Sequence, residues 1–181
     1  MLDDFRENGE RFEVLDHWSM ISNTDIEFNQ LIDHSTLMQG DRTEATMSRT
    51  LIEGLYASVF SCTSAPDLLE RMNARLAPDW ESVGDYTGAR KTRAQFGAQL
   101  SGFGGLIPDL AWKIEELIDA GDRFVVRGRA SGTPVGTFFG VEPRGKKLEI
   151  MSIDIHTVAN GLITRTYHVE DWAGALRQLT A

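Results

Sequence analysis

Three side chains that could transfer protons lie close together in IDIHTVANGLITRTYHVEDW, residues 153–172: Asp154, His156 and His168. A carboxylate and an imidazole within reach of each other can act as a base and an acid. Polar and apolar residues alternate on both sides of Asn160-Gly161, which predicts two strands joined by a tight turn. The polar groups then form either the solvated face of an ordinary antiparallel sheet or the lining of a pocket.

The length of the turn decides which of these side chains meet. If Ala159-Asn160-Gly161 forms a three-residue loop, Asp154 lies opposite Thr166 and diagonal to His168. A two-residue loop shifts the pairing by one residue and instead places side chains from the opposite face of that strand, such as Tyr167, beside Asp154. The sequence leaves both registers open.

The elements that position these residues follow from the apolar periodicity. Apolar residues recur at three- and four-residue steps over residues 46–60, which predicts a helix. A second helix is predicted from Ser64 to just before Pro78, and a third from Thr92 into the glycines at 102–105. Beyond Pro108 the period changes to two and predicts strands over residues 110–117, 123–129, 147–158 and 162–169, followed by a short helix over 172–179. Helices followed by an antiparallel meander indicate an α+β fold.

The charge distribution separates the chain into two parts. Residues 1–45 carry eleven Asp and Glu against three Arg, so they hold −8 of the net charge of −9. We therefore expect an acidic N-terminal arm over residues 1–45 and one folded domain over residues 46–181. An acidic arm and a nearly neutral body argue against nucleic acid as a partner, because nucleic-acid binding requires a clustered basic surface.

Composition also bears on the compartment and on cofactors. The lone cysteine, Cys62, has no partner for a disulfide, which is typical of a reducing compartment. No apolar run is long enough to cross a membrane, and the N-terminus does not resemble a signal peptide. We expect a cytoplasmic protein with no membrane partner. The four histidines lack the spacing of metal ligands, so neither a metal nor another cofactor is predicted.

The second half of the chain resembles the SnoaL-like polyketide cyclase (ester cyclase) family, a branch of the superfamily typified by nuclear transport factor two. The motifs that carry the resemblance are Pro108–Trp112 (Pro-Asp-Leu-x-Trp), Gly121–Arg127, Gly132-Thr133, Gly136–Gly140, Ile153–Ile155, Asn160-Gly161 and Glu170–Trp172. The similarity extends over about residues 48–179. It implies a cone-shaped α+β fold in which three N-terminal helices pack on a curved mixed or antiparallel sheet that encloses a pocket, with a short C-terminal helix.

The resemblance also implies which residues face the pocket. Relatives use a histidine on the penultimate strand and an acid fourteen residues later. At that spacing the chain offers either Asp154 with His168, in reversed order, or His156 with Glu170. The residues that we expect to contact a substrate are Trp80, Tyr86, Trp112, Arg127 and Tyr167. Asp171 has a competing role as the cap of the last helix.

The expected chemistry is acid/base catalysis without a cofactor, of the aldol cyclase or isomerase type, on a small apolar molecule that is cyclic or polyketide-like. A carboxylate in an apolar pocket has a raised pKa and can remove a proton from carbon next to a carbonyl. Asp154 would be that base and His168 its proton partner. Two alternatives remain: a hydrolase resembling epoxide hydrolases, in which Arg127 or Arg129 assists Asp154, and a binding or assembly protein without turnover. By resemblance we expect a homodimer.

Overall fold

The computed structural model describes residues 34–181, so most of the predicted acidic arm over residues 1–45 lies outside the described residues. The elements follow one another along the chain as α1 (His34–Leu55), the π-helix η1 (Tyr56–Phe60), α2 (Leu68–Asn73), β1 (Leu76–Val83), β2 (Lys91–Thr92), α3 (Arg93–Leu106), β3 (Ala111–Asp119), β4 (Arg123–Gly132), β5 (Leu148–Ala159), β6 (Leu162–Glu170) and α4 (Trp172–Thr180). No helix within residues 34–181 is both long and apolar enough to span a membrane.

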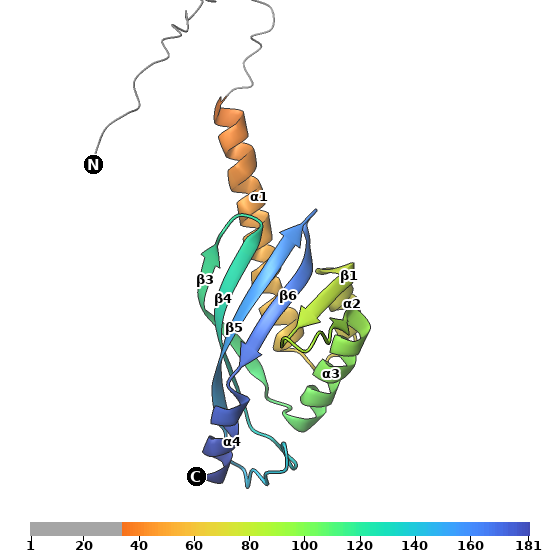
Figure 1. Ribbon diagram of the computed structural model, residues 1–181, viewed down its shortest axis with the longest axis vertical. Helices are drawn as coiled ribbons and strands as arrows, with labels where there is room; N and C mark the ends of the chain where they lie inside the picture. Colours follow the sequence, from red (N-terminus) through yellow and green to blue (C-terminus); the bar gives the residue numbers. More distant parts are fainter. Residues whose placement is uncertain (1–33) are drawn as a thin grey trace, which may run out of the picture. The chain divides into compact units, whose positions relative to one another are not determined.

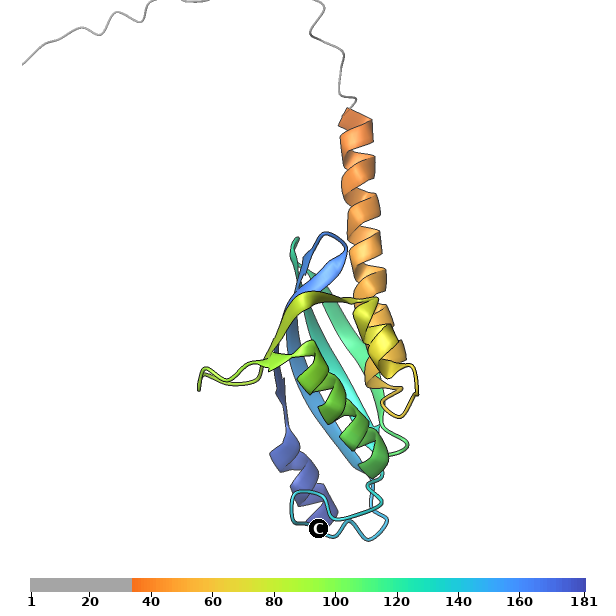
Figure 2. The ribbon, with the colours of Figure 1, turned by 90° about the vertical axis from the view of Figure 1, so that its right-hand side faces the viewer.

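The sheet has six strands in the order β2-β1-β6-β5-β4-β3 (Figure 1). Its four consecutive strands β3 to β6 pair antiparallel, as the alternating pattern predicts. β1 pairs parallel to β6, which makes the sheet mixed. Figure 2 shows α3 lying across one face of the curved sheet. The predicted α+β fold, with helices packed on a curved mixed sheet and a short C-terminal helix, is confirmed.

The core that fixes this arrangement lies between the helices and the inner face of the sheet. α1 and η1 contribute Ile52, Leu55 and Val59, all buried, and the strands contribute Phe124 and Ile163, which are also buried. Alternate residues of β4 are buried, and the residues between them are more exposed. One face of each central strand therefore points to the helices, and residues on that face can reach a site beneath them.

The helix predicted over residues 46–60 begins earlier in the structure, at His34. Side chains over residues 42–47 are exposed, so this stretch buries no apolar stripe. It is held by local interactions instead: Thr46 donates to the carbonyl of Arg42, and Arg49 pairs with Glu53. A search for apolar periodicity detects only the part of a helix that packs against something, which is why the prediction begins late.

The second predicted helix was wrong at its C-terminal end. α2 ends at Asn73, and residues 76–83, which include Pro78, form β1. Proline is tolerated here because β2 covers β1 only at Glu81 and Ser82, and the pairing of β1 with β6 is interrupted between Leu76 and Glu81. The third predicted helix is confirmed as α3, where Thr92 and Gln95 form a reciprocal capping box.

Candidate active site

The β5–β6 hairpin places Asp154 and His168 directly opposite each other. Its turn has two residues, Asn160 and Gly161, with φ angles of 52° and 72°, which is the conformation that Asn-Gly favours in tight hairpins. Thr164 is then an extra residue on β6 and forms a β-bulge that shifts the register by one. Neither predicted register is right: the turn is the shorter one, and the bulge returns Asp154 and His168 to the same face.

Asp154 is a buried carboxylate with one oxygen committed to hydrogen bonds. Its side chain is 3% exposed. The hydroxyls of Tyr56 and Ser152 donate to its Oδ2 at 2.7 and 3.0 Å. Burial raises the pKa of Asp154 from 3.8 to about 6, against the opposing effect of the Tyr56 hydrogen bond. Oδ1 accepts no hydrogen bond from the residues that the structure describes, so it is the oxygen available to a ligand.

A chain of hydrogen bonds behind Asp154 has one consistent direction. Trp80 Nε1 can only donate, and it bonds Thr166 Oγ1 at 3.1 Å, so the Thr166 hydroxyl is free to donate to His156 Nδ1 at 3.0 Å. His156 Nε2 then carries the proton and donates to the Tyr56 hydroxyl at 3.1 Å, and Tyr56 donates to Asp154. Complete burial lowers the pKa of His156 to about 3, so its ring is neutral. The chain therefore supports Asp154 with a donor of fixed orientation.

His168 lies between a carboxylate and a hydroxyl. Its Nδ1 is 2.8 Å from Glu170 Oε1, and its Nε2 is 2.8 Å from Ser82 Oγ. Burial acts to lower the pKa of His168, but the hydrogen bond and charge of Glu170 outweigh it, and the pKa is raised above 6.5. The site thus pairs a carboxyl group whose pKa burial raises towards neutrality with an imidazole whose protonated form Glu170 favours. Such a pair can supply a base and an acid.

These groups line a small apolar cavity under α3. Phe60, Phe96, Leu100, Phe103, Leu110, Trp112 and Trp172 form its apolar wall, and Asp154, Thr166, His168, Glu170 and Gln99 supply its polar groups. Its volume of about 50 Å³ is small. Phe103 and Gln99 also line an adjoining surface groove of about 290 Å³ beside Phe138 and Phe139. A larger open groove of about 1220 Å³ beside α1 contains neither Asp154 nor His168.

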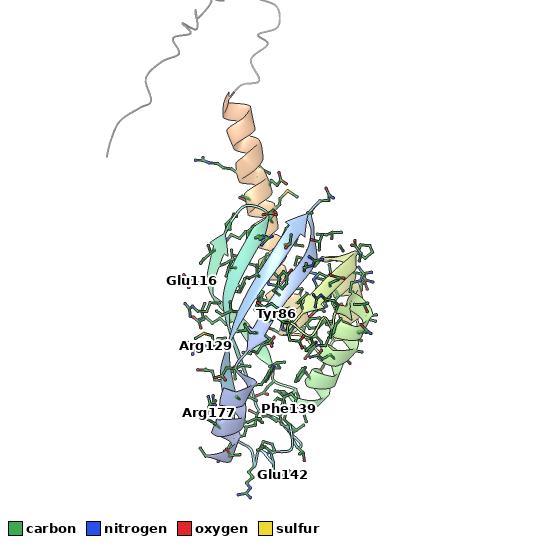
Figure 3. All side chains as sticks on the ribbon, viewed as in Figure 1. Tyr86, Glu116, Arg129, Phe139, Glu142 and Arg177 are labelled. Atoms are coloured by element: carbon green, nitrogen blue, oxygen red, sulfur yellow. The ribbon has the colours of Figure 1, made fainter. Side chains whose placement is uncertain are left out.

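The predicted site residues divide into those at this cavity and those away from it. Trp112 lines the cavity, whereas Trp80 is buried behind it and bonds Thr166. Tyr86 is fully exposed in the segment between β1 and β2, which Figure 2 shows extending away from the sheet. Tyr167 is 41% exposed on the outer face of the sheet. Arg127 is on that outer face too, where it pairs with Glu116, which Figure 3 labels.

His156 does not line the cavity, because Tyr56 lies between its ring and Asp154. The alternative pair of His156 with Glu170 is not formed: Glu170 bonds His168 instead. Asp171 caps α4 by accepting from the Gly174 amide at 2.7 Å, as predicted for its competing role. Among the described residues, no group of three or more His, Cys, Asp or Glu side chains is arranged to hold a metal ion.

Sequence reasoning missed Tyr56 and Ser82. Tyr56 belongs to the apolar stripe of the first predicted helix, and its hydroxyl on that stripe was the available signal. It begins the π-helical turn η1, a form of helix that is frequent at functional sites. Ser82 could not be placed on the inner face of a strand because β1 itself was not predicted.

We expect Tyr56→Phe to move the acid limb of any Asp154-dependent rate to higher pH. The Tyr56 hydrogen bond lowers the pKa of Asp154, so its loss raises that pKa further. The same change leaves the His156 Nε2–H buried without an acceptor, which should reduce the free energy of unfolding by about 1–3 kcal/mol. A pH–rate profile and urea unfolding measure the two effects. An unmoved acid limb would show that the Tyr56 hydroxyl does not tune Asp154.

Comparisons with known proteins agree with this architecture. A search of the curated proteins found no match. IdmH from Streptomyces antibioticus, described as a candidate polyketide cyclase, is 25% identical, with a TM-score of 0.64 over 74% of this chain and 99% of IdmH. TsrD from Streptomyces laurentii is 22% identical, with a TM-score of 0.63 over 74% of this chain and 95% of TsrD. A protein with a ketosteroid isomerase-like fold from Catenulispora acidiphila is 15% identical, with a TM-score of 0.57 over 72% of this chain and 92% of that protein.

A comparison with sequence families covers largely the same part of the chain. The family model described as SnoaL-like polyketide cyclase matches residues 52–179, a range that begins in α1 just before Tyr56 and ends in α4. It spans every strand of the sheet and both partners of the Asp154–His168 pair. The chain belongs to the SnoaL-like polyketide cyclase family.

Proposed function

We propose that the protein catalyses cofactor-free proton transfer at carbon next to a carbonyl, in a small apolar molecule that is cyclic or polyketide-like. The observation that carries the proposal is the buried Asp154 carboxylate, whose pKa of about 6 suits a base working near neutral pH. Asp154 lines an apolar cavity that His168 also lines. The likeness to IdmH, described as a candidate polyketide cyclase, supports an aldol-type or isomerase-type reaction.

In this mechanism Asp154 Oδ1 takes a proton from the carbon, and the electron pair of the broken C–H bond forms an enolate. In an aldol closure the enolate carbon attacks a second carbonyl carbon of the same molecule, and the new alkoxide takes a proton from the His168 imidazolium. A proton passing from Asp154 back to His168, its cross-strand neighbour, restores both groups. In an isomerisation, Asp154 instead returns its proton to another carbon of the enolate.

The ligand would enter past Phe103. Pockets that bind small molecules commonly have volumes of about 300–1,000 Å³, more than the inner cavity holds. The Phe103 ring separates that cavity from the adjoining groove and stacks on Trp172 with 5.4 Å between ring centroids. A rotation of Phe103 would join the two spaces into one apolar site with Asp154 at its inner end.

Deuterium incorporation tests the proposed function. The full chain is incubated in D2O with a panel of cyclic ketones and keto-esters, and the gain in mass is followed against a sample without protein. We expect exchange at the carbon next to the carbonyl. A panel whose members raise the melting temperature but exchange no faster than the blank would contradict catalysis and favour the binding-protein alternative.

We expect Glu170→Gln to move the whole pH–rate profile to lower pH. The profile should rise as Asp154 ionises near pH 6 and fall as His168 loses its proton above 6.5. Glu170 raises the pKa of both groups through its charge. Removing that charge therefore lowers both pKa values and moves both limbs of the profile to lower pH. Glu81→Gln, at an ion pair with Arg165 on the outer face, is the matched control. A profile that moves equally in both variants would rule out a specific role for Glu170.

The hydrolase alternative requires an arginine side chain beside Asp154, and neither candidate arginine lies there. Arg127 pairs with Glu116, and Arg129 pairs with Glu115 and Glu149. Asp154 shares its face of the sheet with its cross-strand partner Val126, so Arg127 and Arg129 point to the opposite face. Figure 3 labels Arg129 and Glu116. Neither guanidinium is therefore in position to assist water activation beside the carboxylate.

We also propose that two copies associate through the outer face of the sheet, as the family resemblance led us to expect. Ile153 and Val169 are cross-strand neighbours there and are 37% and 61% exposed, beside exposed Met151 and Tyr167. Val169→Glu should convert a dimer into a monomer in light scattering coupled to gel filtration, because it places a charge in an apolar contact. Val135→Glu, at a valine outside the sheet that is 69% exposed, should not. A wild-type monomer would contradict the proposal.

A further inference from the structure

Two buried polar atoms at the cavity have no hydrogen-bond partner among the described residues: Trp112 Nε1 and Gln99 Oε1. Both residues line the cavity that holds Asp154 and His168. A buried polar group without a partner is unfavourable, so such groups are rare in folded proteins and are often functional. Two of them at one cavity indicate groups reserved for a ligand.

The position of the Trp112 ring is fixed by its backbone and by two aromatic neighbours. Its backbone is anchored to Ser61, which accepts from the Trp112 amide at 2.9 Å and donates to its carbonyl at 3.2 Å. The ring packs against Phe60 and Tyr56, with centroid distances of 5.7 and 6.4 Å. The indole N–H therefore cannot turn to another partner at low cost, and its direction is set before a ligand binds.

Gly128 explains how the indole comes close to the Asp154 network. A Cβ added to Gly128 would lie 3.7 Å from Trp112 Cε3 and 2.6 Å from Ser152 Oγ. The same hydroxyl donates to Asp154. The absence of a side chain at Gly128 thus allows the Trp112 ring and the Ser152–Asp154 hydrogen bond to occupy neighbouring positions on the inner face of the sheet.

We propose that Trp112 Nε1–H binds the carbonyl oxygen of the substrate whose neighbouring carbon loses its proton to Asp154. An indole nitrogen can only donate, so its ligand must be an acceptor such as a carbonyl or an enolate oxygen. The hydrogen bond strengthens as negative charge develops on that oxygen, and the indole proton is not transferred. This inference rests on the proposed function.

Gln99 extends the inference to a ligand class. Its unpartnered atom is the amide oxygen, which can only accept, so it can pair with a hydroxyl group of the ligand. Combined with the apolar wall, the two groups describe an apolar cyclic ketone that bears a second oxygen function. Such a molecule would place one oxygen on Trp112 and the other on Gln99.

The test uses α-tetralone and tetralin, which differ by the carbonyl. The sequence has four tryptophans, so a ¹⁵N-labelled chain gives four indole N–H signals, assigned by replacing each tryptophan singly by Phe. We expect α-tetralone, and not tetralin, to move the Trp112 signal downfield. In Trp112→Phe the affinity for α-tetralone should fall about tenfold more than that for tetralin, because both ligands lose contact with the indole ring but only the ketone loses a hydrogen bond. Exchange at the tetralone α-carbon should fall on the order of a hundredfold.

The outcomes separate this inference from the proposed function. Suppose that Asp154→Asn abolishes deuterium exchange, that Trp112→Phe exchanges at the wild-type rate, and that the ketone does not move the Trp112 signal. The role of Trp112 is then overturned, while the role of Asp154 as the base is supported. If the ketone moves the Trp112 signal but the wild type incorporates no deuterium, the carbonyl-binding role of Trp112 is supported and the proposed catalysis is contradicted. Should Trp112→Phe fail to fold, the effects of α-tetralone and tetralin on the Trp112 signal of the wild type still test whether the indole N–H binds the carbonyl. Equal shifts from both molecules would overturn the inference.

Discussion

Replacing Asp154 by Asn is expected to reduce deuterium incorporation by on the order of 10²–10⁴, the range attributed to a positioned general base. The amide cannot accept a proton at neutral pH, but it keeps the size of the carboxyl group. It also keeps an oxygen that can accept from Tyr56 and Ser152. The loss should therefore appear in the rate of exchange at saturating substrate more than in substrate affinity.

A carboxyl-to-amide change on the same strand provides the control. Glu149 lies on β5 with its side chain on the outer face, where it pairs with Arg129. Glu149→Gln should exchange as the wild type does. Equal losses in the two variants would mean that damage to the strand, and not loss of the base, causes the effect. Full exchange in Asp154→Asn would remove Asp154 from the mechanism.

The same Asp154→Asn change is expected to stabilise the protein at neutral pH by about 3 kcal/mol. The folded pKa of about 6 lies above the ordinary 3.8, and each pKa unit corresponds to about 1.36 kcal/mol. Because the pKa is raised in the folded state, ionisation of Asp154 opposes folding, and stability is lost as pH rises from about 4 through 6. The ionised carboxylate thus lowers the free energy of unfolding, as groups that serve function rather than stability commonly do.

Urea unfolding of both proteins between pH 4 and pH 8 measures this effect as a difference between their curves. The gain of Asp154→Asn over wild type should be absent below about pH 4, where both states of the wild type bind the proton, and complete above pH 7. Changes at other titrating groups are shared by the two proteins and largely cancel. A difference that does not vary with pH would show that the folded pKa of Asp154 is not raised.

The β-bulge on β6 explains how a hairpin with a two-residue turn can still bring Asp154 and His168 to the same face of the sheet. A two-residue Asn-Gly turn alone would have placed Tyr167 in the series facing Asp154. The bulge at Thr164 corrects the register by one residue, and Tyr167 lies on the outer face while His168 lies on the inner one. Bulges are frequent next to active sites because they redirect a side chain without ending the strand.

The sequence by itself determined the order and type of most elements and singled out Asp154 and His168 as candidate site residues. The four strands from β3 to β6, the Asn160-Gly161 turn and the cap at Asp171 are visible because alternation, turn conformation and capping are local properties of the chain. Asp154 and His168 stand out for the same reason, as titratable residues on strands that alternate polar and apolar positions.

Only the tertiary structure decided which side chains meet. Tyr56 reaches Asp154 from 98 residues away, and β1, which carries Ser82 to His168, is a strand because it pairs parallel to β6. The bulge at Thr164 sets the facing of every residue beyond it. These features depend on packing between distant segments, and the burial that raises the pKa of Asp154 exists only once those segments have closed over it.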